Sequence, residues 1–194
     1  MSAPAESAAA LGDGPAGIPQ PVLVRGTGLL GTSIGIGLSA AGVDVRLHDP
    51  SPAALAVAAD IRAGRPARLD AEGDDLDVAP GLVVVAAPPD VTADVVVDSL
   101  RRWPAAVVVD IASVKEAVAA GVRAAVDDGR LAPQDADRYL GTHPMAGSER
   151  SGPVAARGTL FTQAPWVLCP TDTTHPGALA AGRALARTLQ ATPY

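Results

Sequence analysis

Short β-branched runs alternate with Ala-rich stretches along most of this sequence, and this alternation constrains the fold more than any other feature. It predicts strands joined by crossover helices in a parallel sheet. The predicted strands are Val22–Arg25, Val43–His48, a weaker Ala67–Leu69, Leu82–Ala87, Ala106–Ile111, Tyr139–Thr142 and Trp166–Cys169. The predicted helices are Thr32–Ala41, Pro52–Ala63, Val91–Arg101, Val114–Asp128, Pro133–Arg138 and a last helix that starts at Thr174-His175-Pro176 and is completed by Ala178–Gln190. The segment from His143 to Thr162 lacks strong periodicity, so we expect a long functional loop there.

A glycine-rich loop follows the first predicted strand and opens a helix. Its sequence is Gly26-Thr27-Gly28-Leu29-Leu30-Gly31, and Asp49 lies about 20 residues further on, at the end of the second strand. The G-x-G-x-x-G pattern alone is weak, but a preceding strand, a following helix and this acid are the context that indicates dinucleotide binding. The alternative is a Gly-rich turn with no ligand. We therefore predict a Rossmann-type, doubly wound α/β fold with a mostly parallel sheet, in which this loop holds a pyrophosphate.

The identity of the cofactor is predicted from Asp49. A carboxylate at this position accepts hydrogen bonds from the adenosine ribose and repels a 2′-phosphate, and no Arg or Lys follows it directly. The alternative is that Asp49 only caps the helix beginning at Pro52. NAD is therefore predicted in preference to NADP.

A second group of residues is predicted to meet the loop at one rim of the sheet. In a sheet of order 3-2-1-4-5-6, ligands bind beyond the carboxyl ends of the strands. Ala87 and Pro88 follow the fourth strand, Ser113 the fifth and His143 the sixth. His143 is the candidate acid/base catalyst, because an imidazole can accept a proton at neutral pH, although a lone histidine is more often packed or on the surface. Ser113 is a candidate for contact with substrate or nicotinamide.

Several of these polar residues also have purely structural interpretations. Ser113 and Glu116 form the capping-box pattern of a helix start, which is compatible with a second role for the hydroxyl. Lys115 is interpreted as a first-turn surface residue, His48 as facing the cofactor edge or solvent, and His175 as part of a helix start. The histidines are too scattered for metal ligation, so no metal is predicted.

Composition excludes several classes of function. The formal net charge is −6, aromatic residues make up 3% of the chain, and Lys and Arg do not cluster, which argues against a nucleic-acid partner. Residues 1–21 are predicted to be a disordered tail, and neither a secretory signal nor a membrane helix is predicted. The single cysteine, Cys169, is interpreted as a buried inert thiol. These features together favour a cytoplasmic protein.

The motifs together resemble those of the prephenate/arogenate dehydrogenases of tyrosine biosynthesis. The likeness rests on the glycine loop with Asp49, on Asp110-Ile111-Ala112-Ser113-Val114-Lys115, and on Gly141-Thr142-His143-Pro144-Met145-Ala146-Gly147-Ser148-Glu149. It covers essentially all of residues 22–194, and the His-Pro-Met-Ala-Gly-Ser-Glu segment is its most specific part.

The resemblance implies a reaction and a set of roles. NAD would accept hydride from prephenate, which loses CO₂ and becomes 4-hydroxyphenylpyruvate. His143 would take the proton of the ring hydroxyl, and Ser113 would help orient that hydroxyl and the nicotinamide. Ser148 and Glu149 would lie at the site entrance near the substrate and the cofactor. Arogenate is the alternative substrate. A different class of dehydrogenase, for 3-hydroxy acids or imines, is disfavoured by the segment around His143, and a non-catalytic dinucleotide-binding module stays open.

The family also carries a helical C-terminal domain, which forms the dimer and contributes to binding of the substrate carboxylate. We expect this chain to be a truncated piece that ends before that domain. On this interpretation it folds and binds NAD, turns over prephenate poorly by itself, and forms a homodimer only when the helical domain is present.

Overall fold

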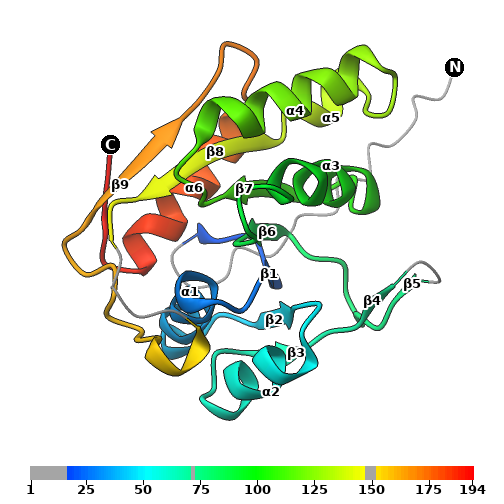
Figure 1. Cartoon of the computed structure of the whole chain (residues 1–194). Helices are drawn as coiled ribbons and strands as arrows, with labels where there is room; N and C mark the ends of the chain where they lie inside the picture. Colours follow the sequence, from blue (N-terminus) through cyan, green and yellow to red (C-terminus); the bar gives the residue numbers. More distant parts are fainter. Residues whose placement is uncertain (1–16, 71–72, 147–151) are drawn as a thin grey trace, which may run out of the picture.

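The computed structural model describes residues 17–70, 73–146 and 152–194, and its centre is an eight-stranded, mostly parallel sheet. The strand order is β10-β9-β8-β7-β6-β1-β2-β3 (Figure 1). These strands are β1 (Val22–Arg25), β2 (Val45–His48), β3 (Arg65–Pro66), β6 (Leu82–Val85), β7 (Val107–Asp110), β8 (Tyr139–Pro144), β9 (Pro165–Cys169) and β10 (Thr192–Pro193). The helices are α1 (Leu29–Ala40), α2 (Pro52–Asp60), α3 (Thr92–Arg102), α4 (Lys115–Asp127), α5 (Pro133–Ala136) and α6 (Pro176–Thr188), and η2 (Pro153–Ala155) is a 3₁₀ turn.

The predicted strand order is confirmed. Strands β3, β2, β1, β6, β7 and β8 are the first six along the main sheet and follow the order 3-2-1-4-5-6. The sheet then continues with β9, which is antiparallel to β8, and with β10, which is parallel to β9. The fold is therefore the predicted Rossmann-type α/β fold, extended at one edge.

The weak third strand was predicted at the wrong residues. β3 consists of Arg65 and Pro66, whereas Leu69 and Asp70 form β4, which pairs with β5 (Gly73–Asp74) in a separate hairpin. The backbone leaves the main sheet because Arg68 bonds to Asp75 in both directions: its carbonyl accepts from the Asp75 amide, and its amide donates to the Asp75 carboxylate. A two-residue edge strand leaves almost no hydrophobic pattern from which it could be predicted.

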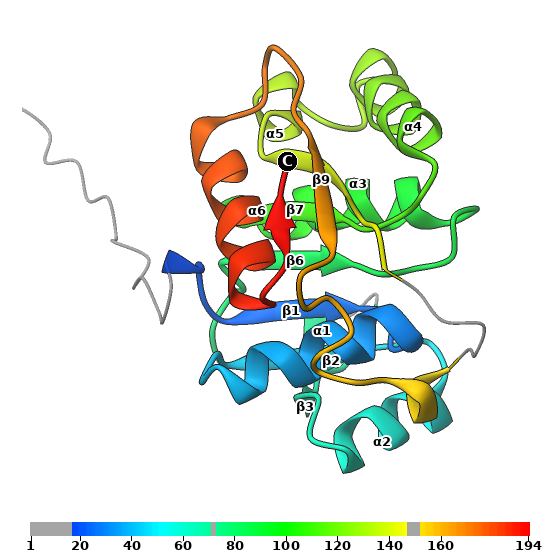
Figure 2. The same cartoon turned by 90° about the vertical axis from the view of Figure 1, so that its left-hand side faces the viewer.

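The central strands are buried on both faces, and their side chains point alternately into two separate hydrophobic cores. On one face, Val22 and Val24 pack with side chains of α1, α2 and α6. On the other face, Leu23 packs with side chains of α3 and α4. The helices accordingly cover the two sides of the sheet in Figure 2. This double burial explains why the strand sequences are apolar without alternation.

Local signals set the helix starts. α2 begins with Pro52 after Ser51, whose hydroxyl accepts from the Ala54 amide. α6 begins with Pro176 after His175, whose Nδ1 accepts from the Gly177 amide. A proline at the first helical position has no amide to leave unsatisfied, which suits it to this place. His175 therefore lies at a helix start, as predicted.

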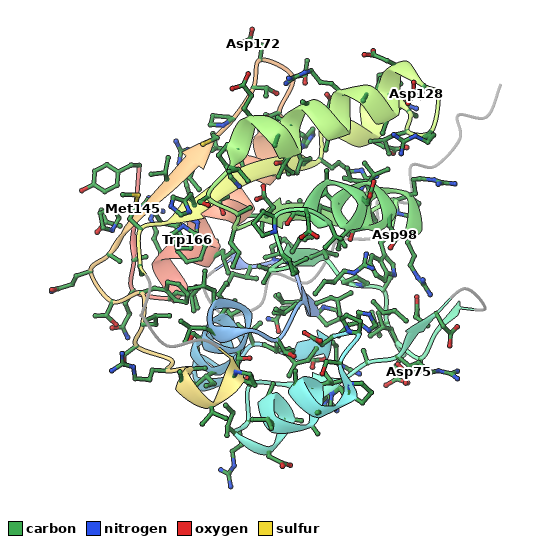
Figure 3. The ribbon with its side chains drawn as sticks, viewed as in Figure 1. Asp75, Asp98, Asp128, Met145, Trp166 and Asp172 are labelled. Carbon is green, nitrogen blue, oxygen red and sulfur yellow. The ribbon has the colours of Figure 1, made fainter. Side chains whose placement is uncertain are left out.

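Two segments differ from the sequence-based expectation. β8 continues through His143 to Pro144, so His143 lies in a strand and not at the start of a loop. At the N-terminal end, Ile18 is fully buried in the core and the Gln20 side chain accepts from the Asp44 amide, although residues 17–21 were assigned to a tail. In the part of the sheet near β10, Trp166 of β9 is fully buried, whereas Met145, which directly follows β8, is 57% exposed; Figure 3 labels both. Within the described parts of the chain, no helix combines the length and apolar character that a membrane span requires.

Candidate functional site

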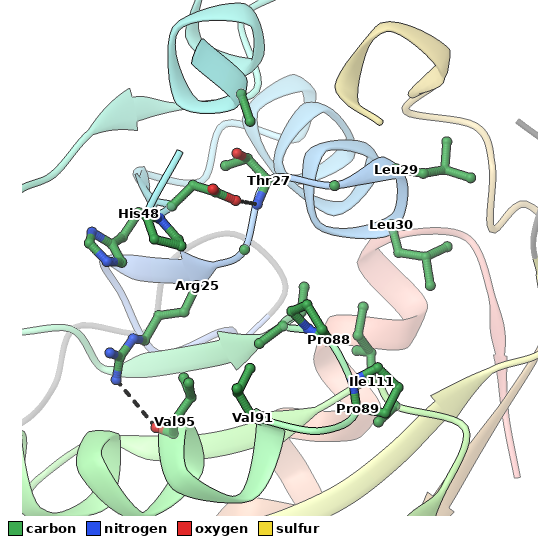
Figure 4. A pocket seen from close by; sticks show the side chains of 18 of the residues that line it. Arg25, Thr27, Leu29, Leu30, His48, Pro88, Pro89, Val91, Val95 and Ile111 are labelled. Atoms are coloured by element: carbon green, nitrogen blue, oxygen red, sulfur yellow. Dashed lines mark hydrogen bonds between the residues drawn. The ribbon is translucent and has the colours of Figure 1, made fainter. Parts of the chain in front are cut away.

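A cavity of about 820 Å³ lies at the carboxyl ends of the parallel strands. It extends from the ends of β1 and β2, past the loops after β6 and β7, to β8. Its walls consist of Arg25–Leu30, His48–Pro50, Ala54, Ala86–Pro89, Val91, Val95, Ile111–Ser113, His143, Gly152 and Pro153. Figure 4 shows Leu29 and Leu30 at the start of α1, with Pro88, Pro89 and Ile111 on the opposite side. The structure thus brings the glycine loop, Asp49, Ser113 and His143 to one site.

The glycines of the loop occupy different environments. Gly26 has φ +110°, and a Cβ placed there would lie 2.4 Å from the Ala86 carbonyl oxygen. A Cβ at Gly31 would lie 2.0 Å from the Gly26 oxygen, so these two positions require glycine for packing. A Cβ at Gly28 would meet no described atom within 4 Å, and Gly28 lines the cavity. Gly28 therefore leaves room for a ligand to approach the backbone at the N-terminus of α1.

Asp49 holds the loop in place. Its Oδ2 accepts from the Thr27 amide at 2.6 Å, a bond drawn in Figure 4, and its Oδ1 accepts from the Ser51 amide at 2.8 Å. The cap of α2 is Ser51 and not Asp49, so the interpretation of Asp49 as that cap is wrong. A carboxylate offers about four acceptor positions, so these two bonds leave capacity for ribose hydroxyls.

His143 and Ser113 lie at the other end of the cavity. The predicted capping box is wrong, because α4 begins at Lys115 after Val114 and has no side-chain cap. The exposed Ser113 side chain is therefore not used at that helix start. The Nδ1 atom of His143 is buried and has no hydrogen-bond partner among the residues that the structure describes. A buried polar atom without a partner is unusual in a folded protein and is typical of a position where a ligand or ordered water supplies the missing bond.

A buried charge network lies behind this end of the cavity. Asp110 is fully buried, and its carboxylate accepts from the Ala112 amide at 2.8 Å, from the Tyr139 hydroxyl at 2.7 Å and from the Lys115 ammonium group. Lys115 is thus part of an ion pair and is not the surface residue that the sequence suggested. Burial lowers the pKa of Lys115, against the opposing effect of Asp110, and burial together with Asp110 raises the pKa of Tyr139. An acid at the end of an apolar strand was the signal that could have revealed this network.

Arg25 and His48 line the end of the cavity next to Asp49. Arg25 donates to Asp98 at 2.6 Å and to Ser99 at 2.7 Å, and its guanidinium lies 5.8 Å from the ring centroid of Trp103. His48 faces the cavity, as one of its two predicted placements stated, and its Nδ1 lies 3.3 Å from the Ala67 carbonyl oxygen. Burial lowers the pKa of His48, and the nearby charge of Arg25 acts in the same direction. Sequence reasoning missed Arg25, because the glycine motif begins one residue later.

Of the remaining predicted site residues, some line the cavity and others do not. Ala87 and Pro88 line the cavity, whereas Gly31 packs beneath the loop and is not part of the wall. Ser148 and Glu149 lie outside the described residues. Cys169 is half-buried in β9 and forms no disulfide. In the described ranges, no group of three His, Cys, Asp or Glu residues is arranged to hold a metal ion.

Comparison with protein families shows which family this chain belongs to. Residues 35–192 match the family model described as prephenate dehydrogenase, nucleotide-binding domain. The chain belongs to this family. A curated relative from Streptomyces niveus, named "Probable prephenate dehydrogenase NovF", is 38% identical over 157 residues, which cover 81% of this chain and 40% of the relative. The predicted family and its nucleotide-binding domain are thereby confirmed.

Solved structures agree with the fold. Synechocystis arogenate dehydrogenase is 26% identical, with a TM-score of 0.74 over 89% of this chain and 58% of that one. Prephenate dehydrogenase from Aquifex aeolicus, in complex with hydroxyphenyl propionate and NAD⁺, is 22% identical, with a TM-score of 0.76 over 90% of this chain and 59% of that one. The chain therefore spans less than two thirds of the length of each of these relatives.

Proposed function

We propose that this chain is the NAD-binding part of an enzyme that oxidises and decarboxylates prephenate in tyrosine biosynthesis. The observation that carries the proposal is that the glycine loop and His143 line the same cavity. In the sequence, the end of the loop at Gly31 and His143 lie 112 residues apart. A nucleotide-binding site and a candidate base must share one space for hydride transfer coupled to proton removal. The family membership and the motif around His143 support the same reaction.

The residues at the loop end of the cavity fit a dinucleotide. The open backbone at Gly28 and the amides at the start of α1 would hold the pyrophosphate, and Asp49 would accept from the adenosine ribose. Ala87 and Pro88 would cover the cofactor from the strand β6 side. The carboxylate of Asp49 favours NAD over NADP, because it would repel a 2′-phosphate. The NAD⁺ bound in the A. aeolicus structure, which has the same fold, supports this choice.

Bound NAD⁺ supplies the hydride acceptor of the reaction. His143 would accept the proton of the substrate ring hydroxyl, because a neutral imidazole is a suitable general base at physiological pH. Its buried, unpartnered Nδ1 means that the ring retains hydrogen-bonding capacity that the described residues do not use. Ser113 would orient the same hydroxyl and the nicotinamide from the turn after β7. General base catalysis of this kind contributes a factor of about 10² to 10⁴ in rate.

The substrate end is proposed from the family resemblance. Ser148 and Glu149 would lie near the substrate at the entrance. Arogenate is a second candidate, supported by the similarity to the Synechocystis arogenate dehydrogenase. We further propose a cytoplasmic location and, for the longer protein, a homodimer formed through a helical domain.

Replacement of His143 tests the proposal. NADH formation is followed with prephenate and with arogenate, for the 194-residue chain and for a version extended past Tyr194. His143→Asn is expected to lower kcat by about 10² or more while NAD affinity, measured by calorimetry, stays the same. An unchanged rate would refute the role of His143 as base and would favour a non-catalytic dinucleotide-binding module.

A further inference from the structure

At the end of the cavity where Ser113 and His143 lie, one wall follows strand β7 and the other is formed by strand β8, and the two strands are no longer paired there. The last paired residues of β7 and β8 are Asp110 and Gly141. Beyond this pair β7 ends and turns toward Ser113, while β8 continues with its partner β9 alone, so that His143 pairs with Val167. The backbone ladder therefore does not fix the spacing between the Ser113 turn and the His143 strand.

Asp110 bonds to both sides of this gap. On the side of the turn, its carboxylate accepts from the Ala112 amide and from Lys115. On the side of β8, the carboxylate accepts from the Tyr139 hydroxyl, and the Asp110 carbonyl oxygen accepts from the Thr142 hydroxyl at 2.7 Å. Thr142 lies one residue beyond Gly141, the last residue of β8 that pairs with β7, and it directly precedes His143.

The network is both buried and closely packed. Asp110 and Thr142 are fully buried and Tyr139 is 8% exposed. A Cβ at Gly141 would lie 3.2 Å from the Tyr139 oxygen and 3.4 Å from the Lys115 Cδ, so the network packs closely against the Gly141 backbone. Buried polar networks with every member bonded are rigid and define one arrangement of the elements that they join.

We infer that Asp110 is a positioning residue, which sets the His143 ring relative to the Ser113 turn through its bonds to Thr142, Tyr139 and the Ala112 amide. This inference rests on the proposed function for its catalytic meaning. Its geometric content is independent of turnover: removal of a bond on the β8 side changes the environment of the His143 ring. Misplacement by about 1 Å can reduce the rate of a reaction by about 10².

The test uses the 194-residue chain and Thr142→Val, which retains the shape of the side chain and removes the hydroxyl. The readout is the imidazole ¹H–¹³C NMR spectrum, because the chain has only three histidines, His48, His143 and His175. The His143 signals, assigned with His143→Asn, are expected to shift in Thr142→Val and to return to their original positions in Thr142→Ser. The signals of the other two histidines are expected to stay in place.

Ser39→Ala is the matched control, because Ser39 also donates from a hydroxyl to a backbone oxygen, that of Ala63, and does not line the main cavity. It is expected to leave all three histidines unchanged. Unmoved His143 signals in Thr142→Val, or equal shifts in Ser39→Ala, would overturn the inference. Should Thr142→Val not fold, Tyr139→Phe carries the same prediction, with the exposed Tyr194→Phe as its control.

A kinetic measurement separates this inference from the proposed function. If prephenate is oxidised, Thr142→Val is expected to lower kcat about tenfold or more, while KM for NAD stays within about twofold of its original value. A decrease in kcat accompanied by an equally large increase in KM for NAD would contradict a positioning role. If no turnover of prephenate or arogenate is found even in the version extended past Tyr194, the proposed function fails, whereas the NMR result still decides whether Asp110 and its partners position His143.

Discussion

Gly28 and Gly31 allow the packing role of the glycine loop to be separated from its ligand-binding role. In Gly31→Ala the new Cβ would lie 2.0 Å from the Gly26 oxygen and 2.9 Å from the Ala86 Cβ. The first contact is with backbone, which moves less readily than the end of a flexible side chain. Overpacking costs about 1–3 kcal/mol, and a clash with backbone places the cost in the upper part of this range; the gain in helix propensity offsets about 1 kcal/mol. We expect a net destabilisation of about 1–2 kcal/mol.

Gly28→Ala is expected to behave differently. Its Cβ would meet no described atom within 4 Å, and its φ of −70° is accessible to alanine. The free energy of unfolding should therefore change by less than about 1 kcal/mol, since the small loss at a helix N-cap is offset by the lower entropy of the unfolded chain. The new methyl group would occupy the place that the proposal assigns to the pyrophosphate. NAD affinity should fall about tenfold or more, which corresponds to about 1.4 kcal/mol.

Thermal unfolding followed by circular dichroism and NAD titration calorimetry measure both effects. For a domain of this size, a loss of 1–2 kcal/mol corresponds to a decrease in Tm of about 2–8 °C for Gly31→Ala. A Gly31→Ala variant as stable as the original chain would refute the packing argument. A Gly28→Ala variant that folds and binds NAD with unchanged affinity would refute the proposed cofactor position.

Three further predictions concern the core, the pH dependence and the buried charge. Ile18→Ala is expected to destabilise the chain by about 2–5 kcal/mol in urea unfolding, whereas Val154→Ala, at an 83% exposed position, should change little. The folded-state pKa of His48 lies below its ordinary value of 6.5, so the unfolded chain binds the proton first and the free energy of unfolding should decrease as pH falls through 6.5. This loss should be smaller in His48→Gln and should persist in the control His175→Gln. Asp110→Asn leaves the Lys115 ammonium without its carboxylate and should cost about 3–5 kcal/mol; a loss below about 1 kcal/mol would contradict the ion-pair description.

The sheet and the loop could be predicted from sequence because their signals are local. Each central strand is a short apolar run, and the glycine loop with Asp49 has fixed spacing within one strand–helix–strand unit. The strand order then follows from the doubly wound topology. β3 was misplaced because both of its residues are exposed, so no hydrophobic pattern distinguishes them from the hairpin that follows.

The polar contacts could not be predicted in the same way, because the sequence around a polar residue does not show which side chains it meets in the folded chain. This holds for partners five residues apart, as Asp110 and Lys115 are, as well as for distant ones. The interpretation of Lys115 as a surface residue used only its place in a helix start, whereas its partner Asp110 is buried beneath it. The capping-box pattern at Ser113 was wrong because α4 begins at Lys115, one residue later than the pattern requires, and its start has no side-chain cap. Arg25 is held by Asp98 and Ser99, more than seventy residues away, so only the folded structure reveals its place in the cavity wall.

The central claim is that one NAD molecule spans the cavity, with its adenosine ribose at Asp49 and its nicotinamide near His143. This position of the ribose would bring the adenine close to His48, which precedes Asp49 in the cavity wall. Intermolecular NOEs between NAD and a chain labelled with ¹³C only in its histidines test this claim directly, without substrate or turnover. We predict NOEs from the nicotinamide protons to the His143 ring, from the adenine protons to the His48 ring, and none to the exposed His175. Nicotinamide NOEs to His48 in place of His143, or binding with no NOE to either ring, would contradict the account.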